Sequence, residues 1–149
     1  MRCVVQRVTS ASVTSMGEMA GEIGKGLMVL LGVEEGDTEK DAVYMAGKIV
    51  KLRIFEDENE KMNLSVRDVQ GDVLCVSQFT LLGDARGQNR PGFTKAENPA
   101  RADELYILTC EEMRKLGVKV ETGVFRTHMQ VTLCNDGPVT LLLDSRKTF

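Results

Sequence analysis

Two uninterrupted apolar runs constrain the fold of this chain more than any other feature of its sequence. Residues 27–33 read Leu-Met-Val-Leu-Leu-Gly-Val, and residues 73–76 read Val-Leu-Cys-Val. Neither run alternates with polar residues or reaches the length of an ordinary helix, which is typical of a strand buried on both faces. We therefore expect interior strands at 27–33 and, with the residues that follow the second run, at 73–79.

Each of these strands is followed by a predicted helix. The first helix begins with Asp37 or Thr38 as its N-cap, and the second begins with Asn98, which precedes a proline at the first helical position. Gly117 ends the second helix. The apolar residues of the first helix share one face, at positions 42, 45, 46, 49 and 50. This alternation of strand and helix predicts a single α/β domain over residues 1–149, with antiparallel hairpins at both ends.

Shorter strands complete the prediction. They are expected at residues 3–8, 52–55, 118–124, 129–134 and 139–143. Met16-Gly17 is the expected turn of an early hairpin, and Asn-Asp-Gly-Pro at 135–138 is the expected turn between the last two strands. Residues 56–63 and 83–97 are predicted loops, and the length of the second suggests a functional role.

Composition argues against several classes of protein. The formal net charge of -3 disfavours broad, non-specific binding to nucleic acid, and no DNA partner is expected. No segment has the pattern of a signal peptide or the roughly 18 apolar residues of a membrane span, so we expect a cytoplasmic protein without a membrane partner. The four cysteines are widely spaced and His128 is the only histidine. We therefore expect no zinc site and interpret the cysteines as reduced core residues.

Two polar stretches interrupt the apolar pattern. Ser-Gln-Phe-Thr-Leu at 77–81 follows the second buried run, and Asn-Asp-Gly-Pro precedes the final strand. On the residues alone, the first stretch fits a cap at the end of a strand and the second fits an ordinary turn. A hydroxyl nucleophile needs a base beside it, and only His128, predicted at the start of a strand, is available.

Together, these two stretches resemble the signature motifs of the D-aminoacyl-tRNA deacylases. "SQFTL" at 77–81 matches the first motif, and "NDGPVT" at 135–140 matches the second. Further similarity lies at Gln6–Val8, Gly26–Val33, Lys61–Val66 and Arg90–Phe93. Both motifs, in this order and over a chain of the family's length, are highly specific, and the similarity extends from Met1 to about Leu143.

The resemblance implies a fold, an assembly and an activity. The implied fold is a single compact domain with three layers, α/β/β, that has mixed, largely antiparallel sheets and two main helices. The family forms a homodimer and needs no cofactor or metal. It hydrolyses the ester at the 3′ end of an aminoacyl-tRNA that carries a D-amino acid or, in some contexts, glycine. The implied partners are thus the aminoacyl-tRNA 3′ end and a second copy of the chain.

The resemblance places the substrate against the first motif. The matching residues, which are the candidate catalytic residues, are Ser77, Gln78, Phe79 and Thr80. Because no base stands nearby, we expect main-chain N–H groups near Phe79 and Thr80 to stabilise an oxyanion. The substrate's own 2′-hydroxyl is expected to position or activate water, and Thr80 to position the substrate rather than act as a nucleophile.

The second motif is implied to act across a subunit boundary. Gly137 and Pro138 of the partner subunit match a cis Gly-Pro pair whose carbonyls project into the same pocket, and Arg7 matches the arginine that braces this pair. Phe125 and Met129 match positions that line the pocket for the terminal adenosine. Carbonyls that crowd one side of the substrate Cα would reject an L-residue and accept a D-residue or glycine.

Two other functions remain open on the residues. One is a dimeric module that binds RNA ends or nucleotides without catalysis. The other is a hydrolase of small D-amino acid esters or amides, which the sequence pI of about 5.3 mildly favours over an RNA role. Arg86, Arg90 and Lys95 are candidates for contacts with acceptor-stem phosphates, although a solvated basic loop fits them equally well.

Overall fold

The first strand, β1 (Arg2–Ser15), organises the sheet of this protein. In the computed structural model, which describes residues 1–149, β1 pairs antiparallel with β8 (Met129–Asp144) along nearly its whole length. Its other edge is shared, because residues 2–8 pair with β3 (Gly26–Gly32) and residues 11–15 with β2 (Glu18–Ile23). β1 therefore joins the two halves of the sheet.

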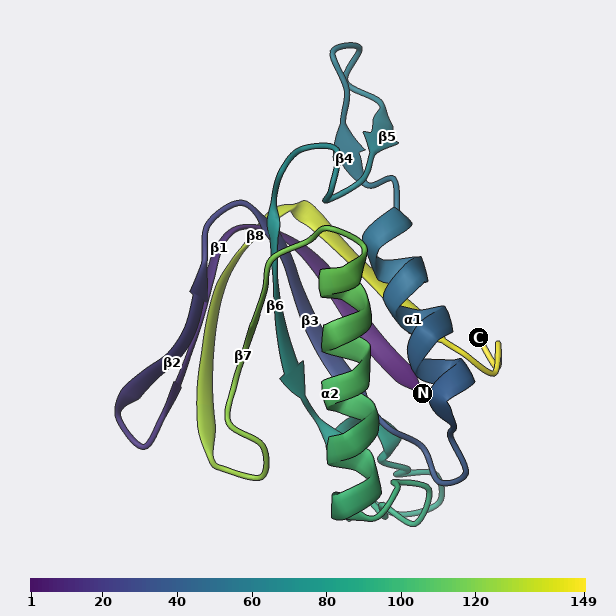
Figure 1. Cartoon of the computed structure of the whole chain (residues 1–149). Coiled ribbons are helices and arrows are strands. Elements are labelled where there is room, and N and C mark those ends of the chain that lie inside the picture. Colours follow the sequence, from purple (N-terminus) through teal and green to yellow (C-terminus); the bar gives the residue numbers. More distant parts are fainter.

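β3 extends the sheet through two parallel neighbours. β6 (Asp72–Ser77) pairs parallel with β3, and β7 (Val120–Thr122) pairs parallel with β6. The strand order is β2-β1-β3-β6-β7, with β8 on β1. A separate hairpin of β4 (Phe55–Glu56) and β5 (Met62–Leu64) projects beyond the end of the first helix (Figure 1). The sheets are thus mixed and largely antiparallel, as expected.

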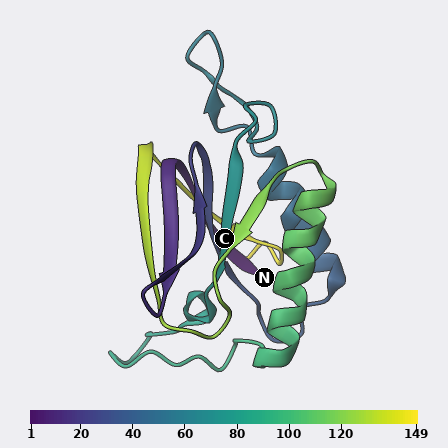
Figure 2. The same cartoon turned by 60° about the vertical axis from the view of Figure 1, so that its left-hand side comes forward.

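Two apolar cores divide the domain into three layers. Helices α1 (Glu39–Lys51) and α2 (Pro99–Lys115) lie side by side over one face of the sheet and enclose the larger core (Figures 1 and 2). The smaller core lies on the opposite face of β3 and β6, beneath the part of the sheet that contains β2. Its members are Val8, Ala11, Val13, Ile23, Met28, Leu74 and Val76. The α/β/β layering implied by the family resemblance is therefore confirmed.

Both helices begin where the sequence predicts, and α2 also ends there. The backbone N–H of Thr38, the N-cap of α1, donates to the carboxylate of Asp41 (2.9 Å). Asn98 caps α2, and its side chain accepts a hydrogen bond from the N–H of Arg101 (3.0 Å). Gly117 follows α2 with φ +93°, a conformation that glycine adopts readily. The residues predicted to share one face of α1 are all buried.

The strand boundaries differ from the prediction at the two motifs. β6 ends at Ser77, and Phe79 lies in a short 3₁₀ helix, η1 (Phe79–Leu82), rather than at the end of a strand. Residues 135–138 do not separate two strands, because β8 runs through them. There the Asn135 side chain replaces part of the strand ladder by accepting a hydrogen bond from the N–H of Val139 (2.7 Å). β1 accommodates the irregularity with register shifts on both sides of Val8.

Shorter elements also differ in extent. β7 is shorter than the predicted strand at 118–124, and the strand predicted at 52–55 begins only at Phe55 because Leu52 caps α1. The predicted loop at 56–63 is largely the turn of the β4–β5 hairpin. Neither α1 nor α2 combines the length and apolar character needed to cross a bilayer.

The cysteines divide into two groups. Cys3, Cys75 and Cys110 are buried, as predicted, and all four thiols are free. Cys134 is exposed, so its interpretation as a core residue is wrong. The cause is the alternation of β8, in which Leu133 packs toward the smaller core and the next residue points outward.

Candidate active site

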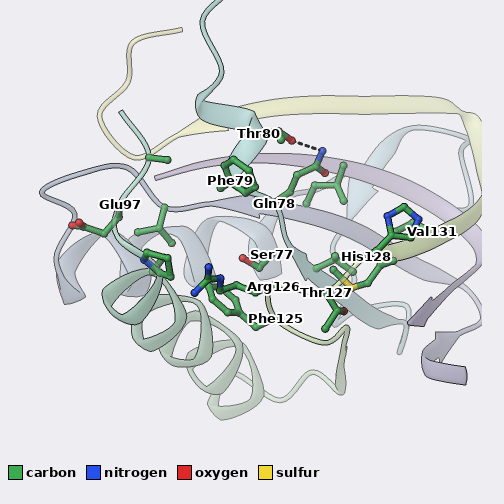
Figure 3. Close-up of a pocket in the computed structure, with 17 residues that line it drawn as sticks. Ser77, Gln78, Phe79, Thr80, Glu97, Phe125, Arg126, Thr127, His128 and Val131 are labelled. Atoms are coloured by element: carbon green, nitrogen blue, oxygen red, sulfur yellow. Dashed lines mark hydrogen bonds between the residues drawn. The ribbon is translucent and has the colours of Figure 1, made fainter. Parts of the chain in front are cut away.

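A pocket of about 790 Å³ lies where three strands end. Because β3, β6 and β7 run parallel, their carboxyl ends meet at one edge of the sheet, which is the usual place for ligand sites in α/β sheets. The pocket is lined by the β6–η1 junction, the start of α2 and the connection from β7 to β8 (Figure 3). Its size is within the range of small-molecule sites.

The first motif forms one wall of this pocket. Ser77, Gln78, Phe79 and Thr80 all line it, because the chain changes there from strand to 3₁₀ helix. The Nε2 of Gln78 donates a hydrogen bond to Oγ1 of Thr80 (2.9 Å; Figure 3). The ring of Phe79 meets that of Phe93 edge to face, with 5.1 Å between centroids. The first N–H groups of a helical turn have no partner within it, so those of Phe79 and Thr80 are available to a ligand.

The opposite wall comes from the connection between β7 and β8. Phe125 stacks on Tyr106 of α2, with 6.3 Å between ring centroids. The Tyr106 hydroxyl donates to the carbonyl of Cys75 (2.6 Å), and burial raises the pKa of Tyr106 well above its usual value, so it remains a donor. A Cβ on Gly123 would stand 2.7 Å from Sδ of Met129. Glycine at position 123 therefore makes room for Met129 at the pocket.

Three polar residues between Phe125 and Met129 also line the pocket: Arg126, Thr127 and His128. The Thr127 hydroxyl donates to the carbonyl of Val124 (2.9 Å) and forms a hydrogen bond with the hydroxyl of Ser15 (2.7 Å). His128 is not hydrogen-bonded to Ser77 or Thr80. The pocket thus holds hydroxyls and a histidine without the hydroxyl–base pair that nucleophilic catalysis requires.

The second motif lies outside this pocket. The Gly137-Pro138 bond is cis and exposed, and Gly137 has φ +140°. A Cβ on Gly137 would stand 2.8 Å from Cγ2 of Val139 and 3.1 Å from the guanidinium of Arg7, so only glycine fits. Arg7 is 6% exposed and donates to the carbonyls of Asp136 (2.9 Å) and Ile54 (2.7 Å). Arg7 therefore fixes the position of the motif.

The residues proposed from the sequence fall into two places. Those that line the pocket are Ser77, Gln78, Phe79, Thr80, Phe125 and Met129. Arg7, Gly137 and Pro138 are not among the residues that line it. A single chain therefore does not bring the two motifs together.

Residues 4–144 match the family model described as D-Tyr-tRNA(Tyr) deacylase, which spans both motifs. The chain belongs to this family. It is therefore an enzyme of the deacylase class, and the family predicted from its motifs is confirmed. A relative from Koribacter versatilis (strain Ellin345), named D-aminoacyl-tRNA deacylase, is 60% identical over 149 residues, which is 100% of each chain.

Two solved structures share the fold of this deacylase-family chain. One, named c-Myc DNA Unwinding Element Binding Protein, is 45% identical with a TM-score of 0.91 and covers 97% of this chain and 98% of that chain. The other, named Structural Analysis of a probable eukaryotic D-amino acid tRNA deacylase, is 17% identical with a TM-score of 0.82. It covers 95% of this chain and 97% of that chain, and supports the fold alone.

The loop at 83–97 is irregular, as predicted, and its cations differ in their contacts. Arg86 pairs with Asp84 (2.6 Å), and this guanidinium holds the pKa of the Asp84 carboxyl well below its usual range. Arg90 and Lys95 form no ion pair within the chain, and none of the three cations lines the pocket. Arg86 is therefore less free to contact a phosphate than the sequence suggested.

Several pocket residues had not been expected from the sequence. Glu97, Pro99 and Ala102 reach the pocket because α2 begins at its edge. Asn98 predicts the start of α2, but it does not predict that this end of the helix borders the pocket. Arg126 has φ +62°, which no local pattern predicts. No group of three or more His, Cys, Asp or Glu is placed to hold a metal ion.

Proposed function

We propose that this protein hydrolyses the ester bond of D-aminoacyl-tRNA, releasing a free D-amino acid and tRNA as a proofreading step of translation in the cytoplasm. One observation carries the proposal. In a chain of the deacylase family, the first motif and the positions matched to adenosine binding form opposite walls of one pocket. Its volume of about 790 Å³ suits a terminal adenosine with its aminoacyl group.

The proposed roles follow from the two walls. Phe125 and Met129 provide apolar contacts for the adenine, with Phe125 supported from behind by Tyr106. The wall of Ser77 to Thr80 holds the ester. Backbone N–H groups of Phe79 and Thr80 stabilise the oxyanion, an effect worth about 3–4 kcal/mol for one donor in other enzymes.

Water is activated by the substrate's own 2′-hydroxyl in this proposal. An aminoacyl ester is already reactive, so positioning and charge stabilisation contribute more than a strong base. The Thr80 hydroxyl accepts a hydrogen bond from Gln78 and has no base beside it. Thr80 therefore acts by positioning.

The second motif acts on the pocket of a partner copy in a homodimer. Gly137 and Pro138 are exposed and held in place by Arg7, yet lie outside their own chain's pocket. A two-fold contact would deliver this motif to each pocket and create two equivalent sites. Its carbonyls would reject the Cβ of an L-residue, whereas a D-residue or glycine would fit. Glycyl-tRNA is therefore a second substrate of the same site.

The test is deacylation of D-Tyr-tRNA, L-Tyr-tRNA and glycyl-tRNA by the purified protein with a chelator present. We expect rapid loss of the D-ester and the glycyl ester and no loss of the L-ester beyond its spontaneous rate. Binding of tRNA without turnover would replace the proposal with a binding module. Turnover of a small D-tyrosine ester as fast as of D-Tyr-tRNA would replace it with a small-ester hydrolase.

A further inference from the structure

Arg126 brings an unpaired charge to the pocket. Glu97 is an acidic residue of the pocket wall, but it does not pair with Arg126. Its carboxylate instead accepts hydrogen bonds from the N–H groups of Gly36 (3.1 Å) and Asn98 (2.9 Å). Arg126 has an exposed side chain and forms neither an ion pair nor a hydrogen bond within the chain. Figure 3 shows it beside Phe125 among the residues around the pocket. The pocket therefore offers a free guanidinium to a ligand.

The backbone holds Arg126 in this place at an energetic cost. Its φ of +62° is in the left-handed region, which disfavours every residue with a Cβ. The other non-glycine residues with positive φ lie outside the pocket. Thr127 fixes the turn through its bonds to Val124 and to Ser15, which is 7% exposed. Conformations of this kind cluster at functional sites, where the surrounding structure maintains them.

We propose that Arg126 forms a phosphate subsite, which binds the phosphodiester that joins the substrate's terminal nucleotide to the rest of the tRNA. This inference rests on the proposed function, because it takes the aminoacyl-tRNA end as the occupant. The carboxyl of the amino acid is esterified and its α-amino group is cationic, so the phosphate supplies the negative charge near the pocket. A guanidinium matches phosphate oxygens with two parallel hydrogen bonds.

The position of Arg126 next to Phe125 in the chain supports phosphate as the ligand. Phe125 is proposed to contact the adenine, and the phosphate on the 5′ carbon belongs to the same nucleotide. The residue next to Phe125 on the turn is thus placed to reach that phosphate while the ester lies against Thr80. The subsite would bind every tRNA, since each carries the same terminal nucleotide.

The test compares the wild type with Arg126→Gly on two small substrates. They are 2′(3′)-O-D-tyrosyl adenosine 5′-monophosphate and the same ester without the phosphate. Glycine adopts φ +62° without strain, so the variant should melt at the wild-type temperature or above. We expect KM for the phosphorylated ester to rise at least about tenfold with kcat unchanged, because the variant loses the charge-assisted hydrogen bonds to the phosphate. The unphosphorylated ester should show no change in either constant.

Two further variants complete the design. Arg126→Lys keeps the charge and should recover part of the lost KM. Lys115→Ala removes a charge of the same sign at the other end of α2, about 24 Å from Pro99 by helical rise, and should leave both substrates unaffected. On D-Tyr-tRNA, Arg126→Gly should reduce the slope of log kcat/KM against log salt concentration by about one, as for loss of one phosphate contact. Lys115→Ala should leave this slope unchanged.

Two outcomes would overturn the subsite, and they differ from failure of the proposed function. Equal KM values for wild type and Arg126→Gly on the phosphorylated ester would exclude it. So would an equal rise in KM for both esters, which would indicate a general effect on the pocket. If the wild type cleaves neither ester nor D-Tyr-tRNA, the proposed function fails. The subsite then predicts tighter binding of AMP than of adenosine, with the difference lost in Arg126→Gly, and no difference in the wild type would exclude it.

Discussion

The two motifs of this protein differ in how firmly the chain holds them. The first motif lies at the end of β6, where Phe79 is 57% exposed and one side-chain hydrogen bond joins Gln78 to Thr80. The second motif lies within β8 and is held by side chains of β1 and of β8 itself. Arg7 donates to the carbonyl of Asp136, and Asn135 bonds both the N–H and the carbonyl of Val139.

This difference fits the two tasks that the proposed function assigns to the motifs, binding of a D-amino acid and rejection of an L-amino acid. A wall that binds many D-amino acids must tolerate different side chains, which suits exposed groups at a strand end. An element that rejects the L-configuration must stay in place when an unwanted Cβ presses against it. Fixed backbone meets that need better than a side chain that changes rotamer. Under the proposed function, the first motif therefore binds the substrate and the second discriminates between D- and L-residues.

Substitution of Gly137 by alanine should have the largest effect. The new Cβ would meet Val139 at 2.8 Å and Arg7 at 3.1 Å, at a φ of +140° that alanine rarely adopts. We expect deacylation of D-Tyr-tRNA to fall by about a hundredfold or more, because small displacements of positioned groups cost rates of that order. Single-turnover deacylation measures the loss.

Gly47→Ala provides a matched control. A Cβ there has no neighbour within 4 Å, and the position is helical. Activity should be unchanged, and stability should rise by about 0.5–1 kcal/mol. If Gly137→Ala retained activity within threefold of the wild type, the second motif would have no part in the reaction.

Replacement of Arg7 by lysine should weaken the support of the second motif and lower the stability of the protein. A lysine ammonium does not reproduce the guanidinium geometry that joins the carbonyls of Asp136 and Ile54, so one buried acceptor loses its partner. We expect the free energy of unfolding to fall by about 2 kcal/mol, measured by urea denaturation. Arg67→Lys, at an exposed residue with one bond to the Leu116 carbonyl, should cost less than about 0.5 kcal/mol. Equal losses for both variants would mean that Arg7 does not brace the motif.

Thr80→Ala should have the smallest effect. The side chain is exposed and has no base beside it, so its removal costs one hydrogen bond with Gln78. We expect the deacylation rate to stay within about tenfold of the wild type and stability to be unchanged. A loss beyond about a thousandfold, roughly 4 kcal/mol in the barrier, would instead make the Thr80 hydroxyl part of the chemistry.

Local chemistry made much of the fold predictable. Thr38 and Asn98 predict the helix starts because threonine and asparagine are preferred at the N-cap, and the glycine after α2 predicts the end of that helix. The uninterrupted runs in β3 and β6 predicted strands buried on both faces, which the two cores explain. These features depend on residues close together in the chain.

The misses depend on distant partners. Residues 135–138 have the composition of a turn, yet they continue β8 because β1 pairs with the strand on both sides and Asn135 closes the gap. Arg126 lies between two predicted strands and was not singled out, because no sequence pattern predicts its positive φ or its position in the pocket. The motif residues were found through family resemblance, and their division between two places was apparent only in three dimensions.

A mixing experiment tests most directly whether the two motifs meet across subunits. Thr80→Trp, which fills the pocket of its own chain, and Gly137→Ala are each expected to be inactive alone. Unfolding and refolding them together makes half of the dimers mixed, and one of the two sites in each mixed dimer then combines an intact pocket with an intact second motif. If the motifs meet across subunits, the mixture should recover about a quarter of wild-type deacylation of D-Tyr-tRNA. No activity above that of the separate variants would contradict a site shared between subunits.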